Sequence, residues 1–150
     1  MKNFIVTLSL VLATAGTGQV FANSTPDDPR TLETFTKKFV GAENIKWSKL
    51  TDGYEKVAFT LSGTRAEAYF GSEGEFLGTV RNIFYSQLPL PVIQAVSNKF
   101  QEASVIEVKE ISNSEGVSYR VILEHKDRKY SLKLNSLGDI TEQQKEKIKK

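Results

Sequence analysis

The chain contains no cysteine and a single histidine, His125, among its 150 residues. The lack of cysteine excludes disulfides, thiol nucleophiles, cysteine-based zinc sites, iron–sulfur clusters and the lipid anchor of a lipoprotein. One histidine excludes every site that needs two, and a Ser-His-Asp triad could use only His125. A large excess of one sign of charge is also missing, because 20 basic and 18 acidic residues leave a net charge of +2. That balance gives no electrostatic reason to expect a nucleic-acid partner.

The composition that remains is typical of one folded domain, with 39% hydrophobic and 25% charged residues. The sequence has no glycine-rich phosphate-binding loop and no recognisable spacing of metal ligands. The acidic pairs Asp27–Asp28 and Glu73/Glu75 fall in a polar segment and in a turn. Such positions indicate solvated charge, whereas a glycosidase needs two carboxylates that face each other across a cleft. We therefore expect no cofactor, no metal and no enzymatic activity.

Residues 1–22 are organised like a secretory signal peptide. Lys2 gives a positive start, Phe4–Ala15 is an apolar run, and Val20–Ala22 places small residues at positions −3 and −1 of a cleavage site. The run is shorter than the roughly 20 residues of a spanning helix, although an uncleaved anchor remains an alternative. Cleavage would leave a periplasmic or secreted protein without a stable membrane anchor, beginning with a polar leader at residues 23–30.

The segment 31–84 shows a helical pattern followed by strand patterns. Asp28–Pro29 is a favourable helix start, and Leu32, Phe35 and Phe39 recur on one helical face. Alternation of apolar and polar residues between glycine turns then predicts four strands, at Asn44–Leu50, Glu55–Leu61, Arg65–Phe70 and Phe76–Ile83.

The same order of elements is predicted again over residues 86–140. Ser86–Pro91 opens a second helix, in which Val92, Val96 and Phe100 share one face. The strands expected after it are Ser104–Ile111, Val117–His125, Lys129–Leu134 and a short one after Gly138. Residues 141–150 form a charged tail, expected to be a frayed helix or to lack structure.

This restart indicates an internal duplication. Lys38–Phe39 aligns with Lys99–Phe100, and further along Val57 and Phe59 align with Val121 and Leu123. We therefore predict an α+β fold of two tandem helix-plus-four-strand antiparallel repeats, 31–84 and 86–140. These would form one sheet with both helices on one face, and the other face would be open to water.

The residues of this pattern also resemble a known family. The run Phe39–Trp47 is similar to the F-x-x-A-x-x-I/V-x-W opening of the PepSY-like domains, which are small exported bacterial proteins related in fold to the beta-lactamase inhibitory protein. The similarity extends over most of residues 31–140, through Gly53-Tyr54, Phe59, Tyr69-Phe70, Gly74, Leu88-Pro89, Tyr119, Val121, Leu123 and Leu134–Gly138. The resemblance implies a periplasmic protein with an open, somewhat concave sheet. It also implies a protein-binding or inhibitor-like role, which rests on analogy of fold.

Strand alternation predicts which side chains line the open face of the sheet. Tyrosine and arginine are enriched in interface hot spots because they combine contact area with directed hydrogen bonds. The alternative is an ordinary solvated face on which lysine and glutamate pair across strands. The candidate partner-binding residues on this face are Tyr54, Lys56, Arg65, Glu67, Tyr69, Arg120, Ile122, Lys129 and Lys133.

These patterns favour a non-enzymatic exported binding module that engages or inhibits another envelope protein through the open face. The alternative is a periplasmic carrier or sensor for a small ligand, such as a peptide or glycan fragment. A hydrolase that uses carboxylates is a weaker third hypothesis, because it would need two inward carboxylates within catalytic distance in a cleft. No nucleophile motif accompanies His125, which is expected to be exposed in a hairpin. Phe84–Tyr85 is expected to plug the junction between the two halves.

Overall fold

The computed structural model of the chain describes residues 25–148. The expected signal peptide and the first residues of the leader lie outside these described residues. The strands are β1 (Glu43–Lys49), β2 (Glu55–Leu61), β3 (Thr64–Phe70), β4 (Phe76–Asn82), β5 (Ser104–Asn113), β6 (Gly116–His125), β7 (Arg128–Asn135) and β8 (Ile140–Lys147). The helices are α1 (Pro29–Lys38) and α2 (Leu90–Lys99), with short 3-10 turns at Thr51–Gly53 and Tyr85–Gln87.

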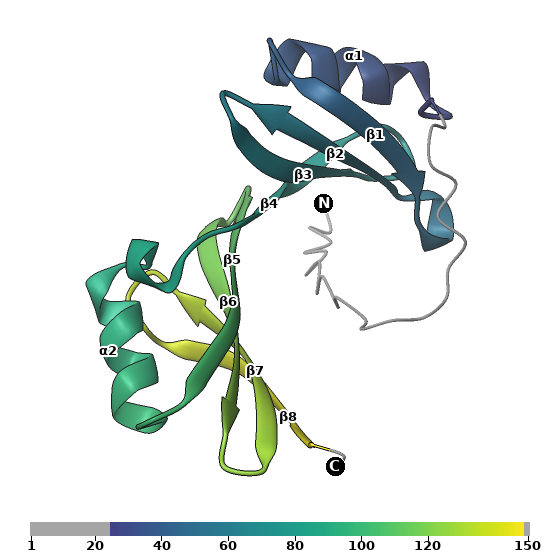
Figure 1. Cartoon of the computed structure of the whole chain (residues 1–150). Coiled ribbons are helices and arrows are strands. Elements are labelled where there is room, and N and C mark those ends of the chain that lie inside the picture. Colours follow the sequence, from purple (N-terminus) through teal and green to yellow (C-terminus); the bar gives the residue numbers. More distant parts are fainter. Residues whose placement is uncertain (1–24, 149–150) are drawn as a thin grey trace, which may run out of the picture.

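All the strands belong to one eight-stranded antiparallel sheet, in which spatial order follows chain order from β1 to β8. A row of directly paired residues crosses its middle, namely Ala68, Thr79, Ser112 and Val117. Ala68 packs in the core beneath α1, and Tyr119 and Val121, on the same side of β6 as Val117, pack beneath α2. Both helices therefore cover one face of the sheet, at opposite ends of it (Figure 1). The other face is called the open face below.

The predicted organisation in two tandem helix-plus-four-strand repeats is wrong. The described chain is mostly sheet, and its eight strands form a single continuous layer with only two α-helices among residues 25–148. β4 and β5, which were assigned to different repeats, pair directly from Gly78 with Asn113 to Asn82 with Lys109. Unpaired strand edges at a repeat boundary would leave backbone N–H and C=O groups without partners, and this pairing satisfies them. The α+β class consequently fits only in part.

The core beneath α1 is aromatic. Asp28 caps the helix by accepting a hydrogen bond from the backbone N–H of Arg30, and Phe35 then enters the core with 2% of its surface exposed. Its ring centroid lies 5.3 Å from that of Trp47 and 5.2 Å from that of Phe59, with both pairs edge-to-face. Such aromatic pairs add stabilisation beyond the area that they bury. Phe35 therefore fixes α1 on the first strands.

The core beneath α2 is mainly aliphatic. Val92 and Val96 of α2 are 0% and 2% exposed. They pack with Leu88, Phe100, Val108, Tyr119, Val121, Leu123, Leu132 and Leu134. Apart from Leu88 and Phe100, which flank α2, these side chains come from one face of α2 and from alternate positions of the strands, as helical and strand periodicity require. The two cores hold the parts of the sheet beneath α1 and α2, whereas Val117, in the row between them, is 42% exposed.

The charged tail forms strand β8, not a frayed helix or an unstructured end. Its side chains are polar and exposed, yet the backbone pairs with β7 from Ile140 to Lys147. Lys133 of β7 donates a 3.2 Å hydrogen bond to Glu142, and Lys99 of α2 donates one of 2.9 Å to Gln143. Tertiary pairing thus overrides a local sequence rich in helix-forming residues. Charged side chains are also typical of edge strands, because they discourage pairing with another chain.

Phe84 does not plug the sheet, because 77% of its surface is exposed. Its neighbour Tyr85 packs against the core beneath α2 instead, and its hydroxyl lies 3.3 Å from both the Ile93 carbonyl oxygen and the Ser97 hydroxyl.

Candidate functional site

An apolar cluster lies at the centre of the open face. Tyr69 of β3, Val80 of β4 and Ile111 of β5 are 7%, 4% and 8% exposed and form a cluster separate from the two helix-covered cores. Leu77 packs against them. Val80 pairs directly with Ile111, so these side chains stand next to each other at the junction of β4 and β5. The open face is therefore not uniformly polar.

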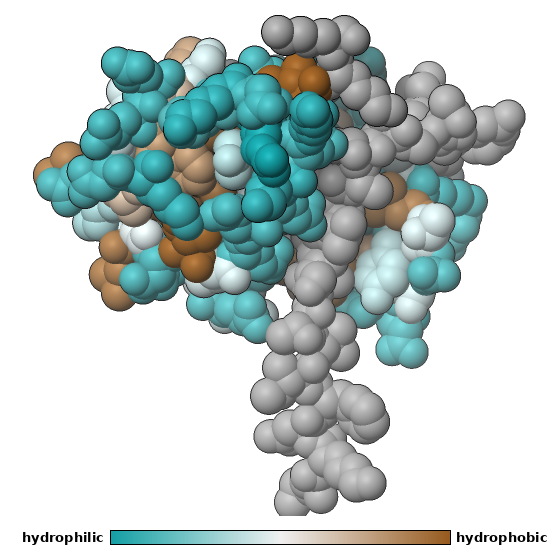
Figure 2. All heavy atoms as spheres, turned by 90° about the horizontal axis from the view of Figure 1, so that it is seen from below, coloured by the Kyte–Doolittle hydropathy of each residue, from teal (hydrophilic) through white to brown (hydrophobic). Residues whose placement is uncertain are grey.

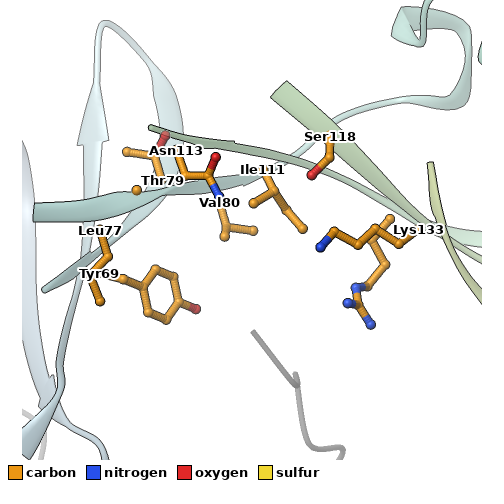
Figure 3. Close-up of a pocket in the computed structure, with 10 residues that line it drawn as sticks. Tyr69, Leu77, Thr79, Val80, Ile111, Asn113, Ser118 and Lys133 are labelled. Atoms are coloured by element: carbon orange, nitrogen blue, oxygen red, sulfur yellow. The ribbon is translucent and has the colours of Figure 1, made fainter. Parts of the chain in front are cut away.

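A small hollow is built around this cluster. Tyr69 and Lys133 point into the space below Val80 and Ile111 from opposite sides (Figure 3). The cavity has a volume of about 30 Å³. Arg120 and Lys133 are the charged residues in its lining, and both are cationic. The described residues that line the hollow are Tyr69, Leu77, Gly78, Thr79, Val80, Ile111, Asn113, Ser118, Arg120 and Lys133.

Gly78 keeps the edge of the hollow open. A Cβ atom at Gly78 would lie 2.5 Å from the Ser112 carbonyl oxygen and 3.0 Å from the Asn113 Cβ, which is closer than real atoms approach. The absence of a side chain therefore lets β4 and β5 come together here. Tyr69 pairs directly with Gly78, so the tyrosine stands beside a position that offers no side chain of its own.

Tyr69 is tied to the polar part of the open face by Glu67. Its hydroxyl donates a 2.9 Å hydrogen bond to Glu67 Oε2, while Lys56 Nζ donates one of 3.2 Å to Glu67 Oε1. Burial raises the pKa of Tyr69 well above its usual value, and the adjacent Glu67 carboxylate raises the pKa further. The phenol therefore stays protonated and acts as a hydrogen-bond donor at neutral pH.

The raised pKa of Tyr69 predicts a loss of stability in alkali. In the unfolded chain a tyrosine releases its proton near pH 10, whereas folded Tyr69 retains it, so above pH 10 the folded state binds more protons. The free energy of unfolding should then fall by up to about 1.4 kcal/mol per pH unit because of this one group. Urea titrations between pH 8 and 11 should show a shallower decline for Tyr69→Phe than for the unmodified protein. Equal slopes for both proteins would contradict the assignment.

Three cations stand side by side next to the hollow. Arg120 of β6 is directly paired with Lys109 of β5 on one side and with Lys133 of β7 on the other. Lys109 lies 3.4 Å from Glu107, and Lys133 lies 3.2 Å from Glu142. We call Lys109, Arg120 and Lys133 the cationic row. Like charges directly opposite each other destabilise a sheet, so this arrangement costs stability.

The structure brings only some of the predicted binding residues together. Tyr69, Arg120 and Lys133 line the hollow, and Lys56 and Glu67 are linked to it through the tyrosine hydroxyl. The remaining predicted residues lie outside the hollow. Arg65 borders neighbouring depressions on β3, Ile122 and Lys129 lie further along β6 and β7, and Tyr54 precedes β2.

Sequence reasoning missed the apolar part of the site. Val80 and Ile111 were read as parts of strands without an assigned face, and Leu77 and Ser118 were not singled out. Their position depends on the register of β4 against β5, which joins segments about thirty residues apart and which local alternation does not fix.

The other candidate groups do not assemble into a chemical site. His125 lies at the end of β6 and is half-buried, with its ring centroid 5.8 Å from that of Phe100. Within residues 25–148, no group of three or more histidine, aspartate or glutamate side chains is placed to hold a metal ion. None of the helices in this part of the chain is long and apolar enough to cross a membrane.

No protein-family model and no curated protein matches the sequence. Solved structures do match the fold. A BLIP-like protein of Bacteroides fragilis has a TM-score of 0.73 at 18% identity, with 85% of this chain and 92% of that chain covered. A DUF2874 family protein of Bacteroides ovatus has a TM-score of 0.75 at 20% identity, with 82% and 89% covered.

A third match is a chain of Bacteroides eggerthii described among "putative periplasmic proteins". Its TM-score is 0.72 at 19% identity, and the match covers 82% of this chain and 90% of that chain. Similarity at this level of identity shows the fold alone. The fold is thus BLIP-like, where BLIP stands for beta-lactamase inhibitory protein, and membership of the PepSY-like family stays a prediction.

Proposed function

We propose that the protein is an exported, non-enzymatic binding module that engages another protein of the bacterial envelope through its open face. The observation that carries this proposal is the hollow, where a buried apolar floor adjoins a cationic row on the face that neither α1 nor α2 covers. Aromatic and arginine side chains in such a setting are the usual anchors of protein interfaces. On the side of the molecule that Figure 2 shows, the coloured surface is largely hydrophilic, with separate hydrophobic spots.

Several observations support an envelope location and a place in the PepSY-like family. The chain begins with a segment organised as a signal peptide, and one structure of the same fold carries a periplasmic description. In the family motif from Phe39 to Trp47, Phe39, Ala42 and Trp47 pack in or against the aromatic core beneath α1, whereas Ile45 is 43% exposed. Inhibition of the bound protein is the further expectation that a BLIP-like fold suggests, and it rests on analogy.

The alternative function, a carrier of a small ligand, has less support. Sites for small molecules enclose most of the surface of their ligand. The hollow has a volume of about 30 Å³, which is space for one or two waters. The neighbouring depressions that Arg65 borders are larger, about 440 and 310 Å³, but polar side chains make up most of their lining, whereas sites for small molecules are mainly apolar. A protruding side chain of a larger partner fits this size better, because the rest of the partner would remain outside on the open face.

Site-specific cross-linking in the native envelope tests the proposal. A photo-reactive residue placed at Ser118, which lines the hollow, should give one discrete adduct with another protein. The same residue placed at Gln94, exposed on α2, serves as the control for random encounters. Adducts from Gln94 but none from Ser118 would contradict binding through the open face.

A further inference from the structure

We infer that Arg120 is the receiving group for a carboxylate carried by an acidic segment of the partner protein. This inference rests on the proposed function, since it names the chemistry of the partner at the same face. The first observation is that most N–H donors of the guanidinium have no described hydrogen-bond acceptor. An arginine has five N–H donors, whereas Arg120 makes one described hydrogen bond, from Nη1 to the Ser131 hydroxyl at 3.3 Å.

The second observation is the missing counter-charge. Each lysine of the cationic row has a carboxylate beside it, Glu107 for Lys109 and Glu142 for Lys133. Arg120, which stands between them, has no carboxylate oxygen within 4.0 Å among residues 25–148. Its Nε is buried and lacks a hydrogen-bond partner in the same part of the chain. An anion bound at the guanidinium would relieve the repulsion along the row and supply the acceptors.

The other acidic group near the hollow does not fill this need. Glu67 already accepts hydrogen bonds from Tyr69 and Lys56, so both of its oxygens are used. None of the residues between 25 and 148 that line the hollow is acidic. An incoming carboxylate would therefore meet Arg120, which has no carboxylate beside it, whereas Lys133 is already paired with Glu142. Arginine is well suited to this contact because its planar fork can hold a carboxylate through two parallel hydrogen bonds.

The apolar floor favours a protein segment over a free anion as the source of the carboxylate. Tyr69, Val80 and Ile111 lie beside the cations, and a free inorganic anion would leave them without contact. A peptide segment can place an apolar side chain on this floor while an adjacent aspartate or glutamate reaches Arg120. The expected ligand is thus an acidic side chain next to a hydrophobic one, presented on a loop of the partner.

Nuclear magnetic resonance of the arginine side chains tests this inference without the natural partner. The probe is a capped peptide with the core sequence Leu-Glu-Leu, and the control peptide carries Gln in place of Glu. Titration with the acidic peptide should shift the Nε–H resonance of Arg120 and the amide resonances of Ile111 and Ser118. The control peptide should give shifts at least tenfold smaller at the same concentration, and added salt should weaken those of the acidic peptide.

Two variants complete the experiment. Arg120→Gln should abolish the response to the acidic peptide, while Arg128→Gln, a matched change at the exposed arginine that begins β7, should preserve it. Equal shifts with both peptides, or a response that survives Arg120→Gln, would overturn the inference. Acetate or sulfate alone producing the same shifts would assign the site to a small anion instead of a protein segment. Cross-linking from Ser118 is independent of this result, so the open face could still bind a partner whose contacts are not acidic.

Discussion

Replacement of Phe35 by alanine is expected to lower the free energy of unfolding by about 3–5 kcal/mol. The substitution removes a ring that is 2% exposed and has its centroid 5.3 Å from those of both Phe39 and Trp47. The cavity would lie between α1 and the first strands, where the neighbouring rings are themselves held by other rings and cannot easily close it. A loss of this size is a large part of the stability of an ordinary domain.

Urea titration followed by the fluorescence of Trp47, the single tryptophan, measures this effect at the affected site. Leu32→Ala is the matched control, because Leu32 lies on the same helix but is 46% exposed, and it should cost less than about 1 kcal/mol. Phe35→Leu provides an intermediate if the alanine variant fails to fold. Similar midpoints for Phe35→Ala and Leu32→Ala would show that the aromatic cluster does not hold α1 in place.

Local patterns were sufficient to place most of the elements. The alternation of Val57, Phe59 and Leu61 predicted a strand at Glu55–Leu61, which is the observed range of β2. Helical spacing placed Leu32, Phe35 and Phe39 on one face and Val92, Val96 and Phe100 on another. Phe35 and the valines of α2 are buried, whereas Leu32 is 46% exposed. These predictions succeed because one face of each element is buried, so burial imposes the period of the element on the sequence.

The arrangement of the elements needed information that local patterns lack. The pairing of β4 with β5 brings Gly78 to Asn113, across the whole of α2. One sheet was expected, but alternation within the segments did not give the register of this pair. The strand character of residues 140–147 depends on β7 as a partner, since the residues themselves are polar and favour helix. Both features depend on pairing between separate segments of the chain. A periodic pattern within one segment does not predict such pairing.

The candidate site was predicted in part for the same reason. Alternation placed Tyr69, Arg120 and Lys133 on one face, and the structure puts these three around one hollow. The prediction from alternation treated Tyr69 as an exposed contact residue. Tyr69 is 7% exposed and packs in the apolar cluster of the open face. The apolar neighbours Val80 and Ile111 come from strands that meet only after folding. Their buried apolar side chains form the floor of the hollow, next to its polar side chains.

Loss of Arg120 is the second large effect that we expect. Arg120→Ala should weaken binding of the natural partner by about 30-fold or more, which is the effect of removing one hot-spot side chain. Tyr69→Ala combined with Arg120→Ala should weaken it further. The tyrosine is buried, however, so the double variant should also lose stability. Tyr69→Phe keeps the ring and separates the contribution of the hydroxyl to binding from that of packing.

The dissociation constant of residues 23–150 with the protein cross-linked from Ser118 therefore tests the central claim most directly. It should be measured by titration calorimetry for the unmodified chain, for Arg120→Ala and for Arg128→Ala, with equal thermal stability verified first. Arg128 is exposed and lies outside the hollow, so its removal should change the constant less than threefold. A rise of 30-fold or more for Arg120→Ala alone is the predicted result. Equal constants for all three proteins would show that the hollow on the open face is not where the partner binds.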